Sequence, residues 1–380
     1  MTGTVARIGA IARKEFVHIV RDWRILVAVL VIPVSQLLLF AYAISFDVKN
    51  VPTVVMDQDK TAASRQYVGA YESSEFFSVK GRVDSLSEVD RAFDTNRARI
   101  AVVVPAGFAR DVARGNKARV AVLIDGSEPN SAQLGQAYAN ALNQSYGQRI
   151  LAEWADRQGL DITQFGRLEP RIRTWYNPEK RSSDYLVPGL MVIIIMIVTV
   201  QQTAVTLVRE RDNGTQEQMM VSPLRQGELM VGKLLPWTVL AFVDMAGITL
   251  VGMLVFGVPM RGSVPFLAAA SVVFVFAALG LGLIISALAP SLETANYIAL
   301  MISFLPAFIL SGFAFPLDSI PPVLQGISYF FPGRYMIVIA RGVFLKGAGL
   351  AELWAQLAML TLYSVIVVGI AAVLYGRRVQ

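Results

Sequence analysis

The sequence predicts an α-helical membrane protein with six transmembrane helices and an α/β domain inserted between the first and second of them. Hydrophobic residues make up 54 % of the 380 residues and charged residues only 16 %, a composition far more apolar than that of soluble domains. Six segments are apolar for about 20 residues, which is long enough to cross a bilayer as a helix. They are residues 25–44, 185–208, 234–256, 266–288, 295–315 and 353–375.

The positions of lysine and arginine orient these spans, because cytoplasmic loops carry an excess of positive charge. Basic residues cluster before the first span, between the second and third, and after the sixth. With six spans these three regions fall on one face, so both termini are expected in the cytoplasm and residues 45–183 outside. The residues concerned are Arg7, Arg13, Lys14, Arg21, Arg24, Arg209, Arg211, Arg225, Lys233, Arg377 and Arg378, against Arg261, Arg334, Arg341 and Lys346 in the opposite loops.

One alternative would change this topology. The tripeptide Ala41-Tyr42-Ala43 follows a basic and then an apolar stretch, as a signal-peptidase site does. The apolar stretch is longer than that of a usual signal peptide, so an uncleaved anchor is favoured.

Residues 45–183 alternate between strand and helix patterns. Ser85 can cap a helix, Pro105 ends a strand, and Gly115 stops a helix. Apolar residues recur at helical spacing from Leu134 to Leu142, which predicts a long amphipathic helix. Strands are expected at 52–55, 76–83, 98–104, 118–124 and 170–176, and helices at 62–71, 85–93, 108–114 and 131–157.

The sequence offers little material for catalysis. It contains no cysteine and a single histidine, His18, which excludes thiolate metal sites and leaves His18 as an interfacial side chain. The run from Gly227 to Gly232-Lys233 matches the spacing of a phosphate-binding loop. It lacks the Ser/Thr that would follow the lysine and it does not follow a strand, so a nucleotide site is not predicted there. Asp57, Asp59 and Asp125 stand at strand ends, where carboxylates usually make turns and caps.

Polar residues inside the spans are candidates for a transport path. Asp244 lies near the middle of the third span, where a carboxylate is costly and usually faces a bundle interior, a cavity or a partner. Gln36, Gln201 and Gln202 are candidate hydrogen-bond partners for it. An interhelical structural bond and a role in the path both remain open.

The segment at about 316–348 is broken by prolines and glycines, and its apolar pieces are too short to cross a membrane. Such pieces suit re-entrant or interfacial helices, which persist at membrane depth where protein or a water-filled cavity surrounds them. Arg334 and Arg341 would then lie at the outer mouth, either contacting substrate or anchoring at the interface.

A charged, glycine-containing loop joins the second and third spans. It is too short to fold as a domain, and the charge distribution places it in the cytoplasm. Residues Thr215–Glu228 have the pattern of a short amphipathic helix, which predicts a docking element at about 212–230 for a partner protein. The candidate contact residues are Arg209, Glu210, Arg211, Gly214, Thr215, Glu217, Gln218, Pro223 and Glu228.

Over essentially its full length the chain resembles the permease subunit of a type-2 ABC transporter, in the drug-exporter-like branch with a large periplasmic domain. In the cytoplasmic loop the resemblance rests on Arg209-Glu210-Arg211, Gly214-Thr215, Glu217-Gln218, Ser222-Pro223-Leu224, Glu228-Leu229 and Gly232-Lys233. Elsewhere it rests on residues 311–316, Pro321, Pro332, Tyr335, Arg341-Gly342 and Lys346-Gly347, and on Asp57, Asp59, Pro105, Phe108 and Asp125-Gly126.

The resemblance implies a cytoplasmic amphipathic helix within residues 1–24, a first span at 25–44, a periplasmic domain at 45–183 and a five-helix domain at 184–380. The segment 212–230 would be the coupling helix that engages a separate cytoplasmic ATPase, and re-entrant helices would precede the sixth span. The expected location is the bacterial inner membrane, and the expected assembly is a homo- or heterodimer of permease subunits.

No catalytic residue, metal site or cofactor is expected in this chain, because the resemblance implies that the partner ATPase binds ATP and magnesium. It also implies a periplasmic adaptor and an outer-membrane channel as further partners; nucleic acid is not expected. The apolar spans fit an amphiphilic drug-like or lipid-like substrate. The competing hypothesis is a membrane-anchored sensor or scaffold that reads a ligand through residues 45–183, although five clustered spans exceed what an anchor needs.

Overall fold

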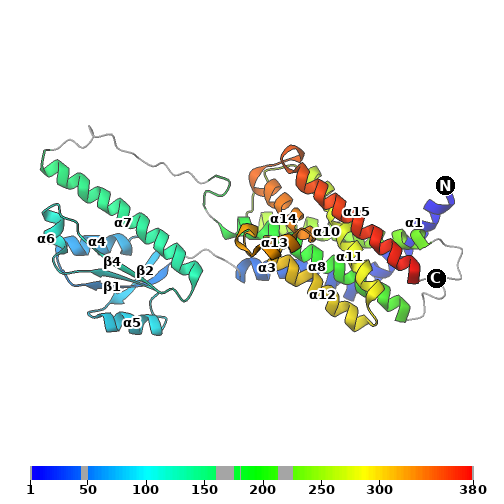
Figure 1. Cartoon of the computed structure of the whole chain (residues 1–380), viewed down its shortest axis with the longest axis horizontal. Coiled ribbons are helices and arrows are strands. Elements are labelled where there is room, and N and C mark those ends of the chain that lie inside the picture. The colour runs from blue at the N-terminus through cyan, green and yellow to red at the C-terminus, as the bar shows by residue number, and fades with distance from the viewer. Residues whose placement is uncertain (1, 44–49, 160–174, 180, 213–225, 379–380) are drawn as a thin grey trace. The chain divides into compact units, whose positions relative to one another are not determined.

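The computed structural model describes residues 2–43, 50–159, 175–179, 181–212 and 226–378. The chain divides into two compact units (Figure 1). Phe46–Arg173 forms an α/β unit, and Met1–Ser45 together with Thr174–Gln380 forms a helical unit.

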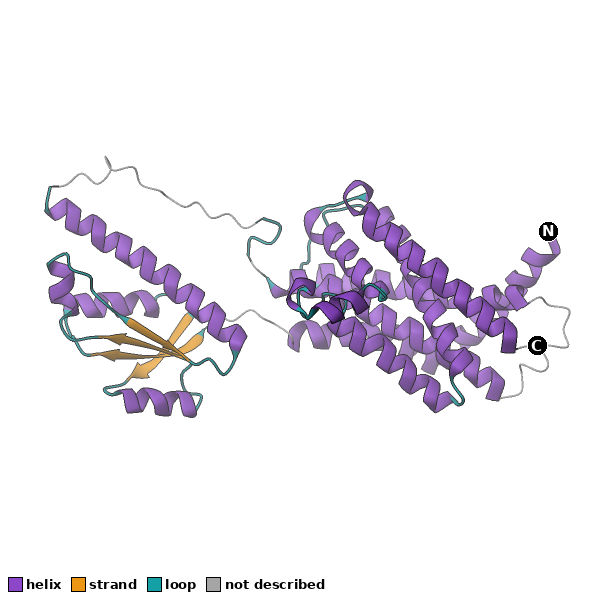
Figure 2. Cartoon of the chain, viewed as in Figure 1, coloured by secondary structure: helices purple, strands orange, loops and turns teal. Residues whose placement is uncertain are grey.

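A four-stranded sheet forms the centre of the α/β unit (Figure 2). The strand order is β2-β1-β3-β4; β1 is parallel to both β2 and β3, and β4 is antiparallel to β3. The expected alternation of strands and helices is confirmed, although β3 and β4 begin later than predicted, and the strand expected at 170–176 falls mostly outside the described residues. The elements are β1 Val51–Asp57, α4 Ala62–Glu72, β2 Phe77–Arg82, α5 Leu86–Asp94, β3 Ile100–Val104, α6 Phe108–Ala113, β4 Ala121–Ile124 and α7 Pro129–Arg157.

Helices cover both faces of this sheet, because successive strand residues point to opposite sides. Val51 and Val55 of β1 share a core with residues of α4, α6 and α7. Val54 and Met56 share a second core with residues of α5. The two cores stabilise the unit without a disulfide, since the chain has no cysteine.

Asn143 of α7 joins that helix to α4 through a buried hydrogen-bond network. Its side-chain oxygen accepts bonds from the hydroxyls of Tyr67, at 2.6 Å, and Tyr71, at 2.9 Å. Both tyrosines are almost fully buried, and a buried hydroxyl without a partner would be costly. The network therefore fixes the position of α7 over the sheet.

The helical unit holds five described helices that are long and apolar enough to cross a membrane. These stretches are Ser182–Thr206, Val231–Leu254, Val264–Leu288, Leu292–Ile309 and Leu350–Leu374. The helices are α1 Thr2–Arg21, α2 Trp23–Leu26, η1 Val27–Val31, α3 Ile32–Ala43, α8 Ser182–Asp212, α10 Gln226–Leu254, α11 Val264–Leu288, α12 Leu292–Ile309, η3 Leu317–Ser319, α13 Pro322–Ser328, α14 Pro332–Arg341, η4 Gly342–Lys346 and α15 Leu350–Arg378.

Helix α8 forms the core of this bundle. Its apolar stretch is 83 % buried inside the chain, whereas those of α12 and α15 are only 22 % buried. Glycine permits its close contact with α11, because a Cβ on Gly282 would lie 2.7 Å from the Cβ of Thr203. Small residues commonly allow such approach between membrane helices. The exposed apolar faces of α12 and α15 are left for lipid or another subunit.

Two expected spans differ from the structure. The apolar helix expected at 25–44 is shorter, Val27–Ala43, and contains the π-helical turn η1. The span expected at 295–315 ends at Ile309, because the chain then turns through Gly312, whose φ is +79°. The segment expected to be re-entrant, 316–348, folds as the short elements η3, α13, α14 and η4.

Candidate functional site

The N-terminal helix α1 packs along the start of α10, and glycine sets their separation. A Cβ on Gly232 would lie 2.8 Å from the Cβ of Ile11 and 3.1 Å from the carbonyl oxygen of Ile8. One turn earlier, Glu228 is only 4 % exposed and forms an ion pair of 3.6 Å with Arg7. A displacement of α10 would therefore move α1 with it.

The structure describes four of the residues predicted to dock a partner, three in α8 and one in α10. Arg209, Glu210 and Arg211 belong to the end of α8, and Arg209 is exposed. Glu228 lies in the first turn of α10 and faces α1. The remaining predicted residues, Gly214, Thr215, Glu217, Gln218 and Pro223, and most of the predicted helix at 212–230, lie outside the described residues. Their role in coupling stays a prediction.

Asp244 is buried in the middle of α10. Its residue is 4 % exposed, and among the described residues its Oδ1 atom has no hydrogen-bond partner. A buried polar atom without a partner is destabilising, and such atoms in native proteins often belong to functional groups. The structure thus identifies Asp244 as a costly group in the bundle.

The glutamines expected to bond Asp244 do not do so in the part of the chain that the structure describes. Gln201 instead donates to Asn296 of α12 at 2.6 Å, which joins α12 to the core helix α8. Gln202, one residue on, is half-buried, and the Oε1 atom of Gln36 is itself buried without a hydrogen-bond partner. The sequence showed these polar residues but not which helices they would join.

Arg341, at the end of α14, ties three segments of the bundle together. Its guanidinium donates to the carbonyl oxygens of Tyr185, Gly312 and Phe313 at 3.3, 2.9 and 3.4 Å. It also lies over the ring of Tyr185, 3.5 Å from the centroid. Because carbonyls satisfy its donors without cancelling its charge, Arg341 remains a cationic group.

Arg334, about two turns earlier in α14, makes similar contacts near the beginning of that helix. It donates to the carbonyl oxygen of Gln325 at 3.2 Å and to the hydroxyl of Ser328. Its guanidinium carbon lies 3.8 Å from the ring centroid of Tyr329. Both arginines therefore have positioning contacts within the chain.

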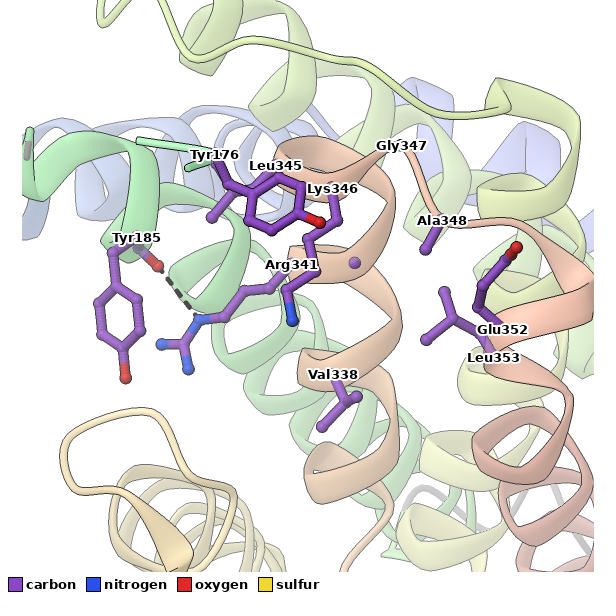
Figure 3. Close-up of a pocket in the computed structure, with 11 residues that line it drawn as sticks. Tyr176, Tyr185, Val338, Arg341, Leu345, Lys346, Gly347, Ala348, Glu352 and Leu353 are labelled. Carbon is purple, nitrogen blue, oxygen red and sulfur yellow. Dashed lines mark hydrogen bonds between the residues drawn. The ribbon is translucent and has the colours of Figure 1, made fainter. Parts of the chain in front are cut away.

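Arg341 also lines a cavity of about 610 Å³ (Figure 3). The cavity lies between the beginning of α8, the end of α14, the π-helical turn η4 and the beginning of α15. Polar lining groups come from Tyr176, Tyr185, Lys346 and Glu352, and apolar ones include Val338, Leu345 and Leu353. A volume of this order is typical of small-molecule pockets.

The carboxylates of the α/β unit act in turns and caps, as the sequence predicts. Asp57 accepts from the backbone N–H of Asp59 and Lys60. Asp59 accepts from the hydroxyl of Thr61 at 2.6 Å and from the backbone N–H groups of Gly107 and Ala109. The hydrogen bond from Thr61, followed by those from the backbone, lowers the pKa of Asp59. These bonds fix the beginning of α6 beside the end of β1.

The comparisons with known proteins identify the family. The model of the family described as ABC-2 family transporter protein matches residues 23–373 of the chain. The chain belongs to this family. It is therefore a multi-pass membrane protein of the ABC transporter class, and its family consists of transport proteins.

Relatives match over four fifths or more of this chain. The chain is 30 % identical to the probable multidrug ABC transporter permease YbhS of Escherichia coli (strain K12), over 98 % of each chain. It is 27 % identical to the probable multidrug ABC transporter permease YbhR of the same strain, over 98 % of this chain and 99 % of that one. It is also 27 % identical to the inner membrane transport permease YhhJ, over 80 % and 79 %. As an ABC-2 permease, the chain is expected to work with ATPase subunits.

Proposed function

We propose that this ABC-2 permease forms the substrate path of an ATP-driven exporter in the bacterial inner membrane, coupled through residues 209–230 to a separate cytoplasmic ATPase. The full-length similarity to permeases named as multidrug transporters carries this proposal. ATP and magnesium would bind to the ATPase, and this chain would contribute no catalytic residue or cofactor.

The proposed topology has six spans, with the apolar helix Val27–Ala43 as the first and both termini in the cytoplasm. The five longer apolar helices support five of the spans. The basic residues before the first span, between the second and third, and at the C-terminus support the orientation. The α/β unit, Phe46–Arg173, would then lie in the periplasm.

The junction between α1 and α10 provides a physical route for coupling. Residues 213–225 connect α8 to α10 in the sequence, so a partner that binds there acts on the beginning of α10. The close contact at Gly232 and the ion pair from Glu228 to Arg7 would transmit that displacement to α1. The partner must bind two conformations of the permease differently, since equal binding would shift neither population.

The substrate path would lie between two permease subunits and would include polar groups of the bundle. Asp244 is the strongest candidate, because its buried carboxylate lacks a hydrogen-bond partner in the described residues. Gln201, Gln202, Arg334 and Arg341 are further candidates, although Gln201 and both arginines already have partners within the chain. Amphiphilic drug-like or lipid-like molecules are the proposed substrates. A periplasmic adaptor and an outer-membrane channel are proposed as further partners.

Purification of the permease with its ATPase tests this function. Glu217→Lys and Gly214→Val should leave the amount of permease in the membrane near normal but abolish its stimulation of ATP hydrolysis. Glu179→Lys reverses an exposed carboxylate elsewhere in the helical unit and serves as the matched control. Normal co-purification, ATPase stimulation and transport by both coupling variants would show that the segment does not couple the subunits.

A further inference from the structure

The cavity beside Arg341 has an unbalanced charge. Arg341 and Lys346 contribute two positive charges, and Glu352 contributes one negative charge. No carboxylate of the described residues lies within ion-pair distance of either cation. The carboxylate of Glu352 caps the beginning of α15, since its Oε2 atom accepts a hydrogen bond of 2.8 Å from the backbone N–H of Gly349. The cavity therefore favours an anion.

The two cations differ in their freedom to bind a ligand. Arg341 donates to three backbone carbonyls and lies against the ring of Tyr185, so its position is fixed. Lys346 is exposed, and its Nζ atom lies 5.9 Å from the ring centroid of Tyr176, at the outer limit of a cation–π contact. A lysine ammonium carries three donors on a flexible stem. Lys346 can thus turn toward a bound anion, while Arg341 supplies a fixed positive field.

The remaining wall is apolar and aromatic. Val338, Leu345 and Leu353 offer aliphatic surface, and the ring of Tyr185 lies beside the guanidinium of Arg341 (Figure 3). Gly347 shapes the edge with a φ of +70°, and a Cβ there would lie 3.3 Å from the carbonyl oxygen of Arg261. A cavity lined by two cations and by aliphatic side chains matches a molecule with an anionic head and a hydrocarbon chain.

We propose that this cavity binds the anionic, phosphate-like head of a single-chain amphiphile, with Lys346 as the mobile contact and Arg341 as the fixed one. This assignment deepens the proposed export of amphiphiles and rests on that function for its physiological role. The binding itself needs only the permease. Charge-assisted hydrogen bonds from Lys346 would supply the preference for an anion.

The test measures equilibrium binding to the purified permease in nanodiscs of zwitterionic lipid, without an ATPase. Three probes share a dodecyl chain: dodecyl phosphate, neutral dodecyl maltoside and cationic dodecyltrimethylammonium. Dodecyl phosphate should bind about tenfold more tightly than the cationic probe. Inorganic phosphate should compete only at much higher concentration, because it lacks the chain that contacts the aliphatic wall.

Variants assign the binding to the cavity. Lys346→Ala should weaken binding of dodecyl phosphate about tenfold, whereas Lys346→Arg should retain it within about threefold. Arg261→Ala removes an exposed cation that lies beside Gly347 but does not line the cavity, so the affinity for dodecyl phosphate should not change. Val338→Trp adds bulk at a half-exposed position of the lining and should weaken all three dodecyl probes.

Three results would each overturn this assignment: equal binding of the phosphate and trimethylammonium probes, an equal loss in Lys346→Ala and Arg261→Ala, or inorganic phosphate competing as well as dodecyl phosphate. Because the ATPase is absent, failure here leaves the coupling experiment unaffected. Conversely, binding that follows these expectations in a permease that never stimulates an ATPase would support the site and contradict the exporter function.

Discussion

Gly232 of α10 and Ile11 of α1 approach so closely that any side chain at position 232 must push the two helices apart. An added Cβ would lie 2.8 Å from both the Cβ and the Cγ2 of Ile11, a distance that real Cβ atoms essentially never show. The contact lies one turn after the ion pair of Glu228 with Arg7. The beginning of α10 is thus bound to α1 by shape and by charge.

Gly232→Val should separate α1 from α10 and lower the stimulation of ATP hydrolysis by the partner. Overpacking of a close contact costs about 1–3 kcal/mol, too little to prevent membrane insertion of a bundle this size. Gly247→Val is the matched control on the same helix, because a Cβ there meets nothing within 4 Å. ATP hydrolysis by the reconstituted complex is the measurement. Equal activity of both variants would contradict a role for the junction in coupling.

Asp244 should matter for transport more than for stability. Asp244→Leu removes a buried carboxylate without a hydrogen-bond partner in the described chain, so it should raise the thermal midpoint, the unpaired group costing about 1–3 kcal/mol. The same variant should lose transport if the carboxylate lies in the path. Asp244→Asn keeps hydrogen-bonding capacity and should transport better than Asp244→Leu. Full transport by both variants would show the carboxylate to be incidental.

Single cysteines can establish the topology, since the chain contains none of its own. Cysteines at the exposed positions Ser127 and Arg261 should react with an impermeant thiol reagent in cells stripped of any outer barrier. Cysteines at Asn213 and Arg378 should react only after lysis. Labelling of position 213 from outside would invert the proposed orientation.

Asp59 should make the beginning of α6 sensitive to acid. Its pKa is lowered from the ordinary value of 3.8, first by the hydrogen bond from Thr61 and then by backbone bonds from Ala109 and Gly107. A group with a lowered folded pKa stabilises the fold above its unfolded pKa, and this contribution is lost as the pH falls through the folded pKa. Amide protection in α6 should therefore be constant between about pH 7 and 5 and decline below about pH 4, after correction for the intrinsic exchange rate.

Asp59→Asn should reduce the protection of α6 at neutral pH and remove its decline in acid. Asp90→Asn, at an exposed position of α5, should leave both the protection of α6 and its decline in acid unchanged. Hydrogen exchange followed by mass spectrometry measures both variants in the full chain. An unchanged acid profile in Asp59→Asn would assign the decline to other groups.

Local patterns in the sequence predicted the elements well, because each depends on residues that are neighbours in the chain. Long apolar runs located five helices of the bundle, and alternating signals located the strands of the α/β unit. The turn at Gly312 was missed because the apolar run continues through Phe313. Its conformation depends on Arg341, whose guanidinium binds the carbonyls of both residues.

Pairings between distant residues could not be predicted. Gln201 and Asn296 are far apart in the sequence, and either could have bonded another helix. Asn143 gave no signal of its bonds to Tyr67 and Tyr71. Glu228 resembled an exposed carboxylate, yet packing of α1 buries it. Such contacts depend on the rotation of each helix, which a single sequence does not fix.

The π-helical turn η1 changes what a one-residue deletion would do to the first apolar helix. The backbone N–H of Ile32 donates to the carbonyl oxygen of Val27, five residues back, whereas an α-helix bonds four residues back. Deletion of a residue from an ordinary helix rotates everything beyond it by about 100°. Deletion of Ala28 would instead relax the wide turn into an α-helix and leave the residues from Pro33 onward facing their present neighbours. The π-helical turn thus contains one residue that an α-helix of the same length along its axis would not need.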